Sequence, residues 1–304
     1  MKILLTLLIL TIFTTAGAIE KFIFIGGDEV ESHENKITRD IDGVQIIYNW
    51  RQLEPEFDQY DFSKIQHDLK YLESRGKKLW IQIQDRSFWI NNKAFPSYII
   101  NEKQYQKGVA LQVDNPGENI PKGHGWVAKQ YNPNVRNRFQ KLLQALAEKF
   151  DGKVYGMNLP ETSMDIDEKA ERKYGFTCDK YFTSTIENIN FARTVFKKSH
   201  VVQYVNFWPC EWNDDKKYMS RFFENAIKSN IGLGGPEVIP YKKAQMKNSY
   251  PFFNKYKGKI PFVAFAIQEP TRTYTNPKTG KKFTDYEFQD FAEKYLGVDV
   301  LFLS

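Results

Sequence analysis

The stretch KVYGMNLPE, residues 153–161, decides the fold, because its short apolar run stops abruptly at a proline and a glutamate. Runs of this kind are typical of strands that are buried on both faces of a parallel sheet. Seven other segments share the pattern: KFIFIGG from Lys21, GVQIIYNW from Gly43, KLWIQIQ from Lys78, HVVQYVNFW from His200, IGLGG from Ile231, PFVAFAIQ from Pro261 and VDVLFLS from Val298.

Between several of these strands the hydrophobic period changes to that of an amphipathic helix. Eight strands that alternate with helices or helix-length connections predict an α/β protein with a (β/α)8 barrel, the TIM-barrel fold. A doubly wound open sheet is the alternative, but the GGDE after the first strand lacks the spacing of a phosphate-binding loop. Three helices show a clear apolar face, made of Val135, Phe139, Leu142, Leu143, Leu146 and Phe150, then Phe182, Ile186, Ile189 and Phe196, then Phe288, Phe291, Ala292 and Tyr295.

Two features of this barrel are irregular. About fifty residues separate Gln84 from the helix near Val135, so the third strand is expected to carry a long insertion. The sequence also ends at the eighth strand, which leaves no final covering helix. There is no internal repeat, low-complexity tract or linker, so residues 19–304 are predicted to form one domain.

The N-terminal segment 1–18, MKILLTLLILTIFTTAGA, combines a lysine, an apolar run and a small-x-small ending. This pattern predicts a signal peptide that is cut after Ala18. A membrane anchor is the alternative, but the apolar run is short for a span of roughly 20 residues. We therefore expect a secreted or periplasmic protein that is not attached to a membrane after cleavage.

The formal net charge of +6 comes from Lys and Arg residues that are scattered along the chain. A nucleic-acid groove would interleave a basic run with aromatic residues, and no such run occurs, so no nucleic-acid partner is expected. The charge indicates either a solvated basic surface or attraction to an acidic polymer. We expect the protein to be a monomer.

The chain has two cysteines, Cys178 and Cys210, and no His motif links either of them to catalysis. In an exported protein such a pair favours a disulfide, with free buried thiols as the alternative. The barrel would place both residues at its carboxyl-terminal end on neighbouring units, where a bridge is geometrically sensible.

In a (β/α)8 barrel the chemistry lies at the carboxyl ends of the strands. These ends are rich in carboxylates, amides and Trp and poor in His, and HExxH, GxSxG and metal-ligand clusters are absent, so no metal or cofactor is expected. Aromatic rings suit the C–H faces of sugars, and carboxylates and amides suit their hydroxyls. Glu161 and Glu269 are the catalytic candidates, and the predicted substrate-binding residues are Trp50, Asp85, Trp89, Asn158, Asn206, Trp208, Glu237 and Gln268.

The segment YNWRQLEPEFDQYDFSKI, residues 48–65, resembles the W-x-x-L-E-P-x-x-G-x-Y-D-F segment of family 42 β-galactosidases. A strand-four tip with an Asn and a Glu, plus a Glu at the tip of strand seven, is similar to the retaining glycoside hydrolases of clan A, which include family 5. The resemblance implies that Glu161 is the acid/base and Glu269 the nucleophile, with carboxyl groups about 5 Å apart. In the clan, Asn directly precedes the acid/base Glu; here Pro160 does.

Other residues and functions stay open from sequence alone. Trp126 and Trp212 are further stacking candidates, and Trp80, inside strand three, is expected in the core. Glu54 has a possible structural role in the LEP turn, and Glu237 follows a glycine pair that would let a ligand approach the backbone. The rival functions are a non-catalytic carbohydrate-binding barrel and a barrel hydrolase or lyase that acts on a different polymer.

Overall fold

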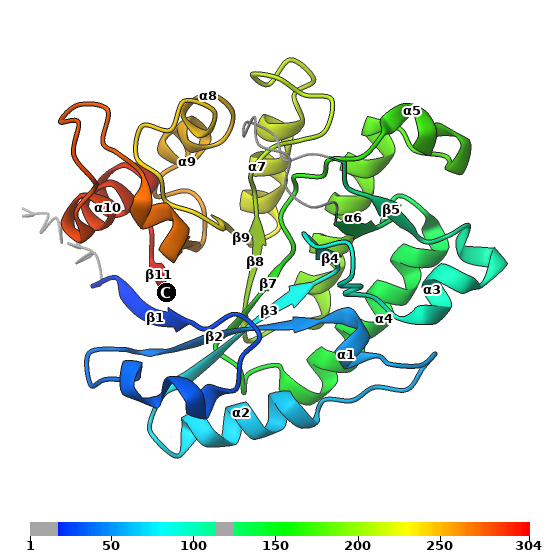
Figure 1. Ribbon diagram of the computed structural model, residues 1–304, viewed down its shortest axis with the longest axis horizontal. Helices are drawn as coiled ribbons and strands as arrows, with labels where there is room; N and C mark the ends of the chain where they lie inside the picture. The colour runs from blue at the N-terminus through cyan, green and yellow to red at the C-terminus, as the bar shows by residue number, and fades with distance from the viewer. Residues whose placement is uncertain (1–17, 114–124) are drawn as a thin grey trace, which may run out of the picture.

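Eight parallel strands close into a barrel in this computed structural model, which describes residues 18–113 and 125–304 except for the side chains of Glu269 and Pro270. The predicted (β/α)8 fold is thereby confirmed (Figure 1). Residues 1–17, and with them nearly all of the predicted signal peptide, lie outside the described residues. The barrel strands are β1 (Glu20–Phe24), β2 (Gly43–Asn49), β3 (Lys78–Gln84), β7 (Gly156–Leu159), β8 (His200–Tyr204), β9 (Gly232–Gly235), β10 (Val263–Ile267) and β11 (Val300–Leu303).

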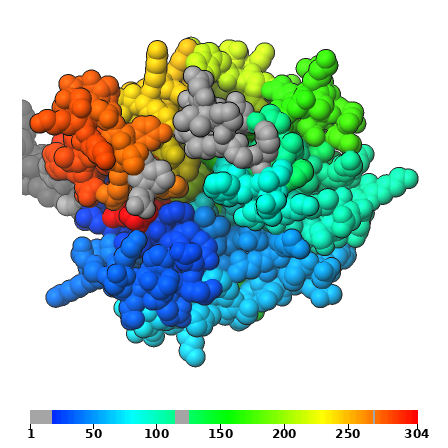
Figure 2. All heavy atoms as spheres, viewed as in Figure 1, coloured from blue at the N-terminus to red at the C-terminus, as the bar shows by residue number. Residues whose placement is uncertain are grey.

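The first and last barrel strands close the ring. β1 pairs with β11 in parallel, with Glu20 opposite Val300 and Ile23 opposite Leu303. Figure 2 shows the same closure on the surface, where atoms from the two ends of the chain, blue and red, lie side by side. The C-terminal residues are therefore structural members of the barrel.

Helices surround the barrel in Figure 1, and the three predicted amphipathic helices are confirmed as α4, α6 and α10 followed by η5. A 3-10 helix, η1, replaces the first helix of the ideal fold. No helix in the described ranges is both long enough and apolar enough to cross a membrane. The α-helices are α1 (Trp50–Leu53), α2 (Ser63–Glu73), α3 (Ser97–Asn101), α4 (Pro133–Phe150), α5 (Glu168–Glu171), α6 (Cys178–Val195), α7 (Tyr218–Lys228), α8 (Gln245–Asn248), α9 (Tyr250–Lys255) and α10 (Asp285–Phe291). The 3-10 helices are η1 (Val30–Lys36), η2 (Lys103–Tyr105), η3 (Arg172–Tyr174) and η4 (Glu269–Thr273), and η5 (Ala292–Leu296) is a π-helix.

The long insertion predicted after the third barrel strand is present between β3 and α4. Besides α3 and η2 it contains three very short strands, β4 (Arg86–Ser87), β5 (Val109–Leu111) and β6 (Trp126–Ala128). They form a small antiparallel sheet with β6 in the middle. Residues 114–124 of the insertion lie outside the described part of the chain.

Trp80 fills the barrel interior at the level of β3, as expected for a core residue, and it is fully buried. Its ring lies 5.1 Å from the ring of Phe302 and 6.1 Å from that of Phe22, measured between centroids. A Cβ atom at Gly156 would lie 2.5 Å from the Trp80 ring, so the glycine of KVYGMNL makes room for the indole. Packed side chains, rather than a pore, therefore occupy the barrel.

Asp151 ties the end of α4 to the segment that leads into β8. Its carboxylate accepts backbone N–H bonds from Lys197, Lys198 and Ser199 at 2.9–3.0 Å. Partial burial alone would raise the pKa of Asp151, but these three bonds outweigh it and lower the pKa. The ionised carboxylate is therefore a stabilising contact of the folded state.

We expect Asp151→Ala to lower the free energy of unfolding at pH 7 by about 1–3 kcal/mol, because three donors lose a charged acceptor. Since the folded pKa lies below the unfolded value of about 3.9, the contribution is complete above that pH and is lost as the pH falls through the folded pKa. Urea unfolding of wild type and Asp151→Ala from pH 7 to pH 3 measures this. A stability difference that stays constant over that range would contradict the assignment.

Candidate active site

The segment that carries Glu161 leaves the tip of β7 and is held by hydrogen bonds along its length. Because Pro160 has no N–H to donate, its carbonyl is its backbone hydrogen-bonding group, and it accepts from the Gln203 side chain. The backbone N–H of Thr162 donates to the carbonyl of Tyr204 at 3.1 Å, and its carbonyl accepts from the Tyr181 hydroxyl at 2.9 Å. The departure from the clan pattern at residue 160 thus coincides with a firmly anchored turn.

Glu161 is the partly exposed residue between two buried neighbours, Pro160 and Thr162. Its Oε2 accepts a hydrogen bond from the Asn206 side chain, which lies just beyond the end of β8. The backbone N–H of Asn206 in turn donates to the Thr162 hydroxyl at 3.1 Å. Two predicted site residues, Glu161 and Asn206, are therefore brought into direct contact at the carboxyl-terminal end of the barrel.

A buried ion pair lies beside this carboxylate. Arg86 Nε lies 3.1 Å from Asp85 Oδ1, and both side chains are almost completely buried. Burial alone would lower the pKa of Arg86, but the nearby charges, chiefly Asp85 and also Glu161, raise it. The guanidinium also donates to the Ser163 carbonyl at 2.5 Å, so a permanent positive charge is fixed against the segment that carries Glu161.

A small cavity of about 30 Å³ lies beside these groups and is lined by Asp85, Arg86, Glu161, Tyr181 and Gln203 among others. Its volume admits about one water molecule. Asp85 also accepts from the Gln130 side chain at 2.9 Å. Asp85, a predicted substrate contact, is thus placed below the surface, where it balances Arg86.

The tip of β10 supplies the second half of the predicted catalytic pair. Gln268 is half-buried and precedes η4, and its carbonyl accepts from the N–H of Thr271 at 3.0 Å. Glu269 begins η4, three barrel strands beyond the strand that leads to Glu161. The side chain of Glu269 lies outside the described residues, so the carboxyl separation of about 5 Å stays a prediction.

Asn158, a predicted substrate contact, is placed inside the barrel. β7 extends to Leu159, so Asn158 is a strand residue and not a tip residue. Its Oδ1 accepts from Gln45 at 2.9 Å and from the Trp80 indole at 3.0 Å, and it is fully buried. In this position Asn158 serves the core beneath the opening and offers a ligand no exposed surface.

Two of the predicted stacking residues, Trp50 and Trp208, are also core residues here. Trp50 is fully buried, with its ring 5.2 Å from that of Phe139 on α4. Trp208 is 3% exposed and packs on Phe182 and Phe222, at 5.1 Å from each ring. Apolar helix faces therefore cover both indoles, which leaves no ring face for a sugar.

Three other tryptophans are accessible. Trp89 is 70% exposed and Trp212 is 55% exposed. Trp126 is half-buried in β6 and donates to the Ile90 carbonyl at 2.8 Å. Trp89 and Trp126 lie in the insertion after β3, and Trp212 lies in the loop after β8, so both regions offer exposed indole surface above the barrel strands.

Glu237 and Glu54, the remaining carboxylates of interest, have different surroundings. Glu237 follows β9, is partly exposed and lies 3.9 Å from the ammonium group of Lys242. Glu54 is fully buried and accepts from the Trp50 indole at 2.8 Å and from Arg138 of α4. These contacts support the structural role of Glu54 in the LEP turn, which the sequence alone had left open.

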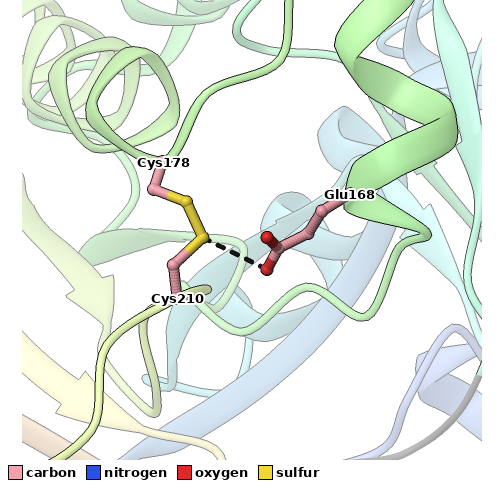
Figure 3. A group of neighbouring side chains, drawn as sticks. All are labelled: Glu168, Cys178 and Cys210. Carbon is pink, nitrogen blue, oxygen red and sulfur yellow. Dashed lines mark hydrogen bonds between the residues drawn. A yellow bond between two sulfur atoms is a disulfide. The ribbon is translucent and has the colours of Figure 1, made fainter.

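The predicted disulfide is present between Cys178, the first residue of α6, and Cys210, in the loop after β8. In Figure 3 the carboxylate of Glu168 points at the bridge, with Oε1 3.1 Å from Cys210 Sγ. These three residues are the potential metal-ligating group found in the described ranges. Because both sulfurs are consumed by the bridge, the group offers a metal a single carboxylate in this oxidised form.

We expect the double variant Cys178→Ser/Cys210→Ser to lose about 2–4 kcal/mol of unfolding free energy, because the bridge joins residues 32 positions apart. Urea unfolding with and without dithiothreitol measures the loss. The reductant should destabilise the wild type to a similar extent and leave the double variant unchanged. Equal stability of oxidised and reduced wild type would show that the bridge contributes nothing.

Several residues that organise this site were not among the predicted ones. Tyr181 and Gln203 fix the backbone on either side of Glu161, and Arg86 supplies its buried positive neighbour. The sequence does give a sign of the role of Arg86. It places Asp85 and Arg86 side by side directly after an apolar strand, and charged side chains that are buried there must pair with each other. Tyr181 and Gln203 sit in an amphipathic helix and a strand, where nothing in the local pattern distinguishes them.

Comparison with known proteins adds the fold but no close relative. No protein-family model matches the sequence, and no curated protein matches it. Solved structures do match, and the chain is similar to a β-amylase catalytic domain from Paenibacillus polymyxa, with a TM-score of 0.57, 8% identity and coverage of 93% of this chain and 91% of that one.

Two further structures represent other enzymes with the same architecture. The catalytic core of xylanase A matches with a TM-score of 0.56 and 11% identity over 95% of this chain and 87% of that one. A β-galactosidase from Bacillus circulans sp. alkalophilus matches with a TM-score of 0.59 and 13% identity over 94% of this chain. This chain spans about half of that β-galactosidase, 50% of its length. At these identities the likeness establishes a barrel fold shared with glycoside hydrolases.

Proposed function

We propose that this chain is a secreted glycoside hydrolase that cleaves an O-glycosidic bond with retention of configuration, with Glu161 as acid/base and Glu269 as nucleophile. The observation that carries the proposal is the partly exposed Glu161 at the tip of the fourth barrel strand, bonded to Asn206 at the tip of the fifth. Support also comes from the fold, which is shared with a β-amylase, a xylanase and a β-galactosidase.

The chemistry assigns one task to each residue. The carboxyl of Glu161 protonates the leaving glycosidic oxygen while the Glu269 carboxylate attacks the anomeric carbon and forms a glycosyl-enzyme. Glu161 then takes a proton from the water that releases the sugar. The Asn206 amide holds Oε2 of Glu161, which leaves Oε1 to face the substrate. Neither step needs a metal or an organic cofactor.

A glycan panel tests the proposal. Wild type, Glu161→Gln, Glu269→Gln and the control Glu148→Gln, an exposed residue of α4, are incubated with oligosaccharides and polysaccharides that differ in sugar and linkage. The expected result is cleavage of at least one glycan by wild type and the control, with loss in both site variants, and a first-formed product that keeps its anomeric configuration by NMR. Cleavage that neither site variant reduces would overturn the proposal.

A non-catalytic carbohydrate-binding barrel is the second candidate, and one observation favours it. Asn158, the asparagine that precedes Glu161 in the sequence, is fully buried, with its side chain bonded to Gln45 and Trp80, and Pro160 holds the place of the clan's asparagine. The amide donor that reaches Glu161 comes instead from Asn206, beyond the neighbouring strand, which departs from the pattern of the clan that the sequence resembles. Binding of one glycan of the panel without cleavage of any would support this candidate.

A further inference from the structure

A groove of about 810 Å³ runs between the loop after β8 and the segment that contains α8 and α9. Asn213 and Lys217 line one side, and Tyr241, Lys243 and Lys247 line the other. In Figure 1 the yellow-green loop above α7 and the gold segment labelled α8 and α9 stand next to each other at the top of the view. The loop that starts with Asn206, the partner of Glu161, thus also forms a wall of this groove.

Two aromatic rings with ammonium groups over them lie at the groove: Tyr241 lines it, and Trp212 directly precedes the lining residue Asn213. The ring of Trp212, 55% exposed, has the ammonium of Lys247 4.6 Å from its centroid. The ring of Tyr241, 37% exposed, has the ammonium of Lys278 at 4.0 Å. A flat ring beside a cation can take the C–H face of a sugar and an acidic substituent of that sugar at the same time.

Part of the positive charge at the groove lies outside ion pairs, although the loop after β8 also carries the carboxylates of Glu211 and Asp215. Lys217 pairs with Asp214 at 3.5 Å, and Lys242 lies 3.9 Å from Glu237, so those charges are compensated. Within the described ranges Lys243, Lys247 and Lys278 take part in no ion pair, although all three are exposed. Lys243 and Lys247 line the groove, and Lys278 lies beside it over the ring of Tyr241, so ammonium groups outside ion pairs gather there and favour an anionic ligand.

The backbone of the groove is held in a costly conformation. Of the nine non-glycine residues with positive φ in the described chain, five lie in its two loops, namely Cys210, Asn213, Asp214, Lys217 and Tyr241. Such conformations cluster where the surrounding structure holds a functional geometry. Here the Glu211 carboxylate accepts from the N–H groups of Tyr218 and Met219, and the Asn213 N–H donates to the Asn248 side chain at 3.0 Å, so hydrogen bonds hold the loop in this conformation.

We propose that this groove binds an anionic polysaccharide, whose acidic groups contact Lys243, Lys247 and Lys278 and whose rings lie against Trp212 and Tyr241. This inference rests on the proposed function for its choice of a glycan over other polyanions, and it extends that function by giving the substrate carboxylate or sulfate groups. The groove then holds the polymer while the bond to be cleaved lies at Glu161, on the same rim of the barrel.

Affinity electrophoresis and calorimetry with four polymers test this, using the Glu161→Gln protein so that no polymer is cleaved. Dextran, carboxymethyl-dextran and dextran sulfate share one backbone and differ in charge, and a poly(dT) oligonucleotide represents other polyanions. We expect binding of both charged dextrans, weakening as NaCl is raised, and no binding of dextran. Absence of binding to either charged dextran, or tighter binding of poly(dT), would overturn the proposal.

Matched variants locate the site. Lys243→Ala/Lys247→Ala is expected to weaken binding about tenfold to thirtyfold, as two lost ammonium–anion contacts near the surface would. Trp212→Ala should weaken it by about tenfold. The control Lys70→Ala/Lys141→Ala removes the same charge from exposed positions on α2 and α4 and should change the affinity less than twofold. Equal weakening by both double variants would mean that net charge alone binds the polymer.

The binding experiments and the glycan panel distinguish failure of the groove proposal from failure of the hydrolase proposal. If wild type cleaves neutral glycans only, in a Glu161-dependent way, and charged dextrans do not bind, the groove proposal fails and the hydrolase proposal stands. If charged dextrans bind through Lys243 and Lys247 while no glycan is ever cleaved, the groove proposal stands and the hydrolase proposal fails.

Discussion

Glu161→Gln is expected to lower kcat/KM on the glycan that the wild type cleaves by about 10²–10⁴-fold, the usual contribution of a general acid. The amide of glutamine keeps the size of the side chain and can still contact Asn206, but it cannot protonate a leaving sugar oxygen. The folded structure should survive, because Glu161 is partly exposed and the backbone of Thr162 beside it is held by the Tyr181 hydroxyl and the Tyr204 carbonyl. Initial rates on the natural glycan measure the loss.

The leaving group separates this role from a merely structural one. An aryl glycoside that releases a stable phenolate needs little protonation, so Glu161→Gln should form the glycosyl-enzyme on it at a rate near that of wild type and then stall at hydrolysis. A burst of phenolate followed by a slow steady state is the expected trace, whereas Glu269→Gln should give no burst. If Glu161→Gln slowed formation of the glycosyl-enzyme equally on natural and activated substrates, Glu161 would only shape the site.

Glu54→Leu is expected to have the largest effect on stability, a loss of about 3–5 kcal/mol in the free energy of unfolding. Glu54 and Arg138 form an ion pair in which both side chains are buried, and the carboxylate also accepts from the Trp50 indole. Burial alone would lower the pKa of Arg138, but its bonds to Asp58, Tyr98 and Glu54 raise it, so the guanidinium stays charged. Removal of Glu54 would leave that charge buried with weaker partners.

Two further variants show whether the loss comes from the buried charge of Arg138. Asp58 also pairs with Arg138, at 2.7 Å, but its side chain is 49% exposed, so Asp58→Asn should cost no more than about 1 kcal/mol. The double variant Glu54→Leu/Arg138→Met removes both charges, and it should recover much of the loss because well-packed apolar residues often replace a buried pair at little cost. Urea unfolding of the three proteins decides. A double variant no more stable than Glu54→Leu would contradict the electrostatic explanation.

The structural role of Glu54 also shows what can be concluded from segment 48–65, which resembles a segment of family 42 β-galactosidases. Its Trp and Glu are four residues apart, and in the structure they bond to each other and to α4. The Trp and Glu of this segment therefore attach the turn after β2 to α4. It supports the fold, whereas the assignment of catalysis depends on the tips of β7 and β10.

The barrel itself was predictable because each of its strands is buried on both faces and reads as a near-continuous apolar run. β4, β5 and β6 were not, since strands of two or three residues are too short to show any period. Their sheet forms from pairing between segments about twenty to forty residues apart, such as Val109 with Ala128. Pairing of this kind leaves no local mark in the sequence.

The candidate site was predictable by position but not by side-chain direction. A strand tip was read from the end of an apolar run, which correctly placed Glu161 and Asn206 near each other. One residue of difference decides whether a side chain points inward or upward, and Asn158 fell on the inward side. Exposure of Trp208 likewise depended on α6 and α7, whose apolar faces close over it.

The Cys178–Cys210 bridge has a consequence for how the protein must be produced. Asn206, which bonds to Glu161, lies in the short segment between the end of β8 and Cys210. The far end of this segment is attached to α6 only after the disulfide has formed. Protein made in a reducing cytosol would lack this bridge, and the candidate site at Glu161 would be less well ordered even with the barrel intact. Thiol titration before any activity screen distinguishes an immature protein from an inactive one.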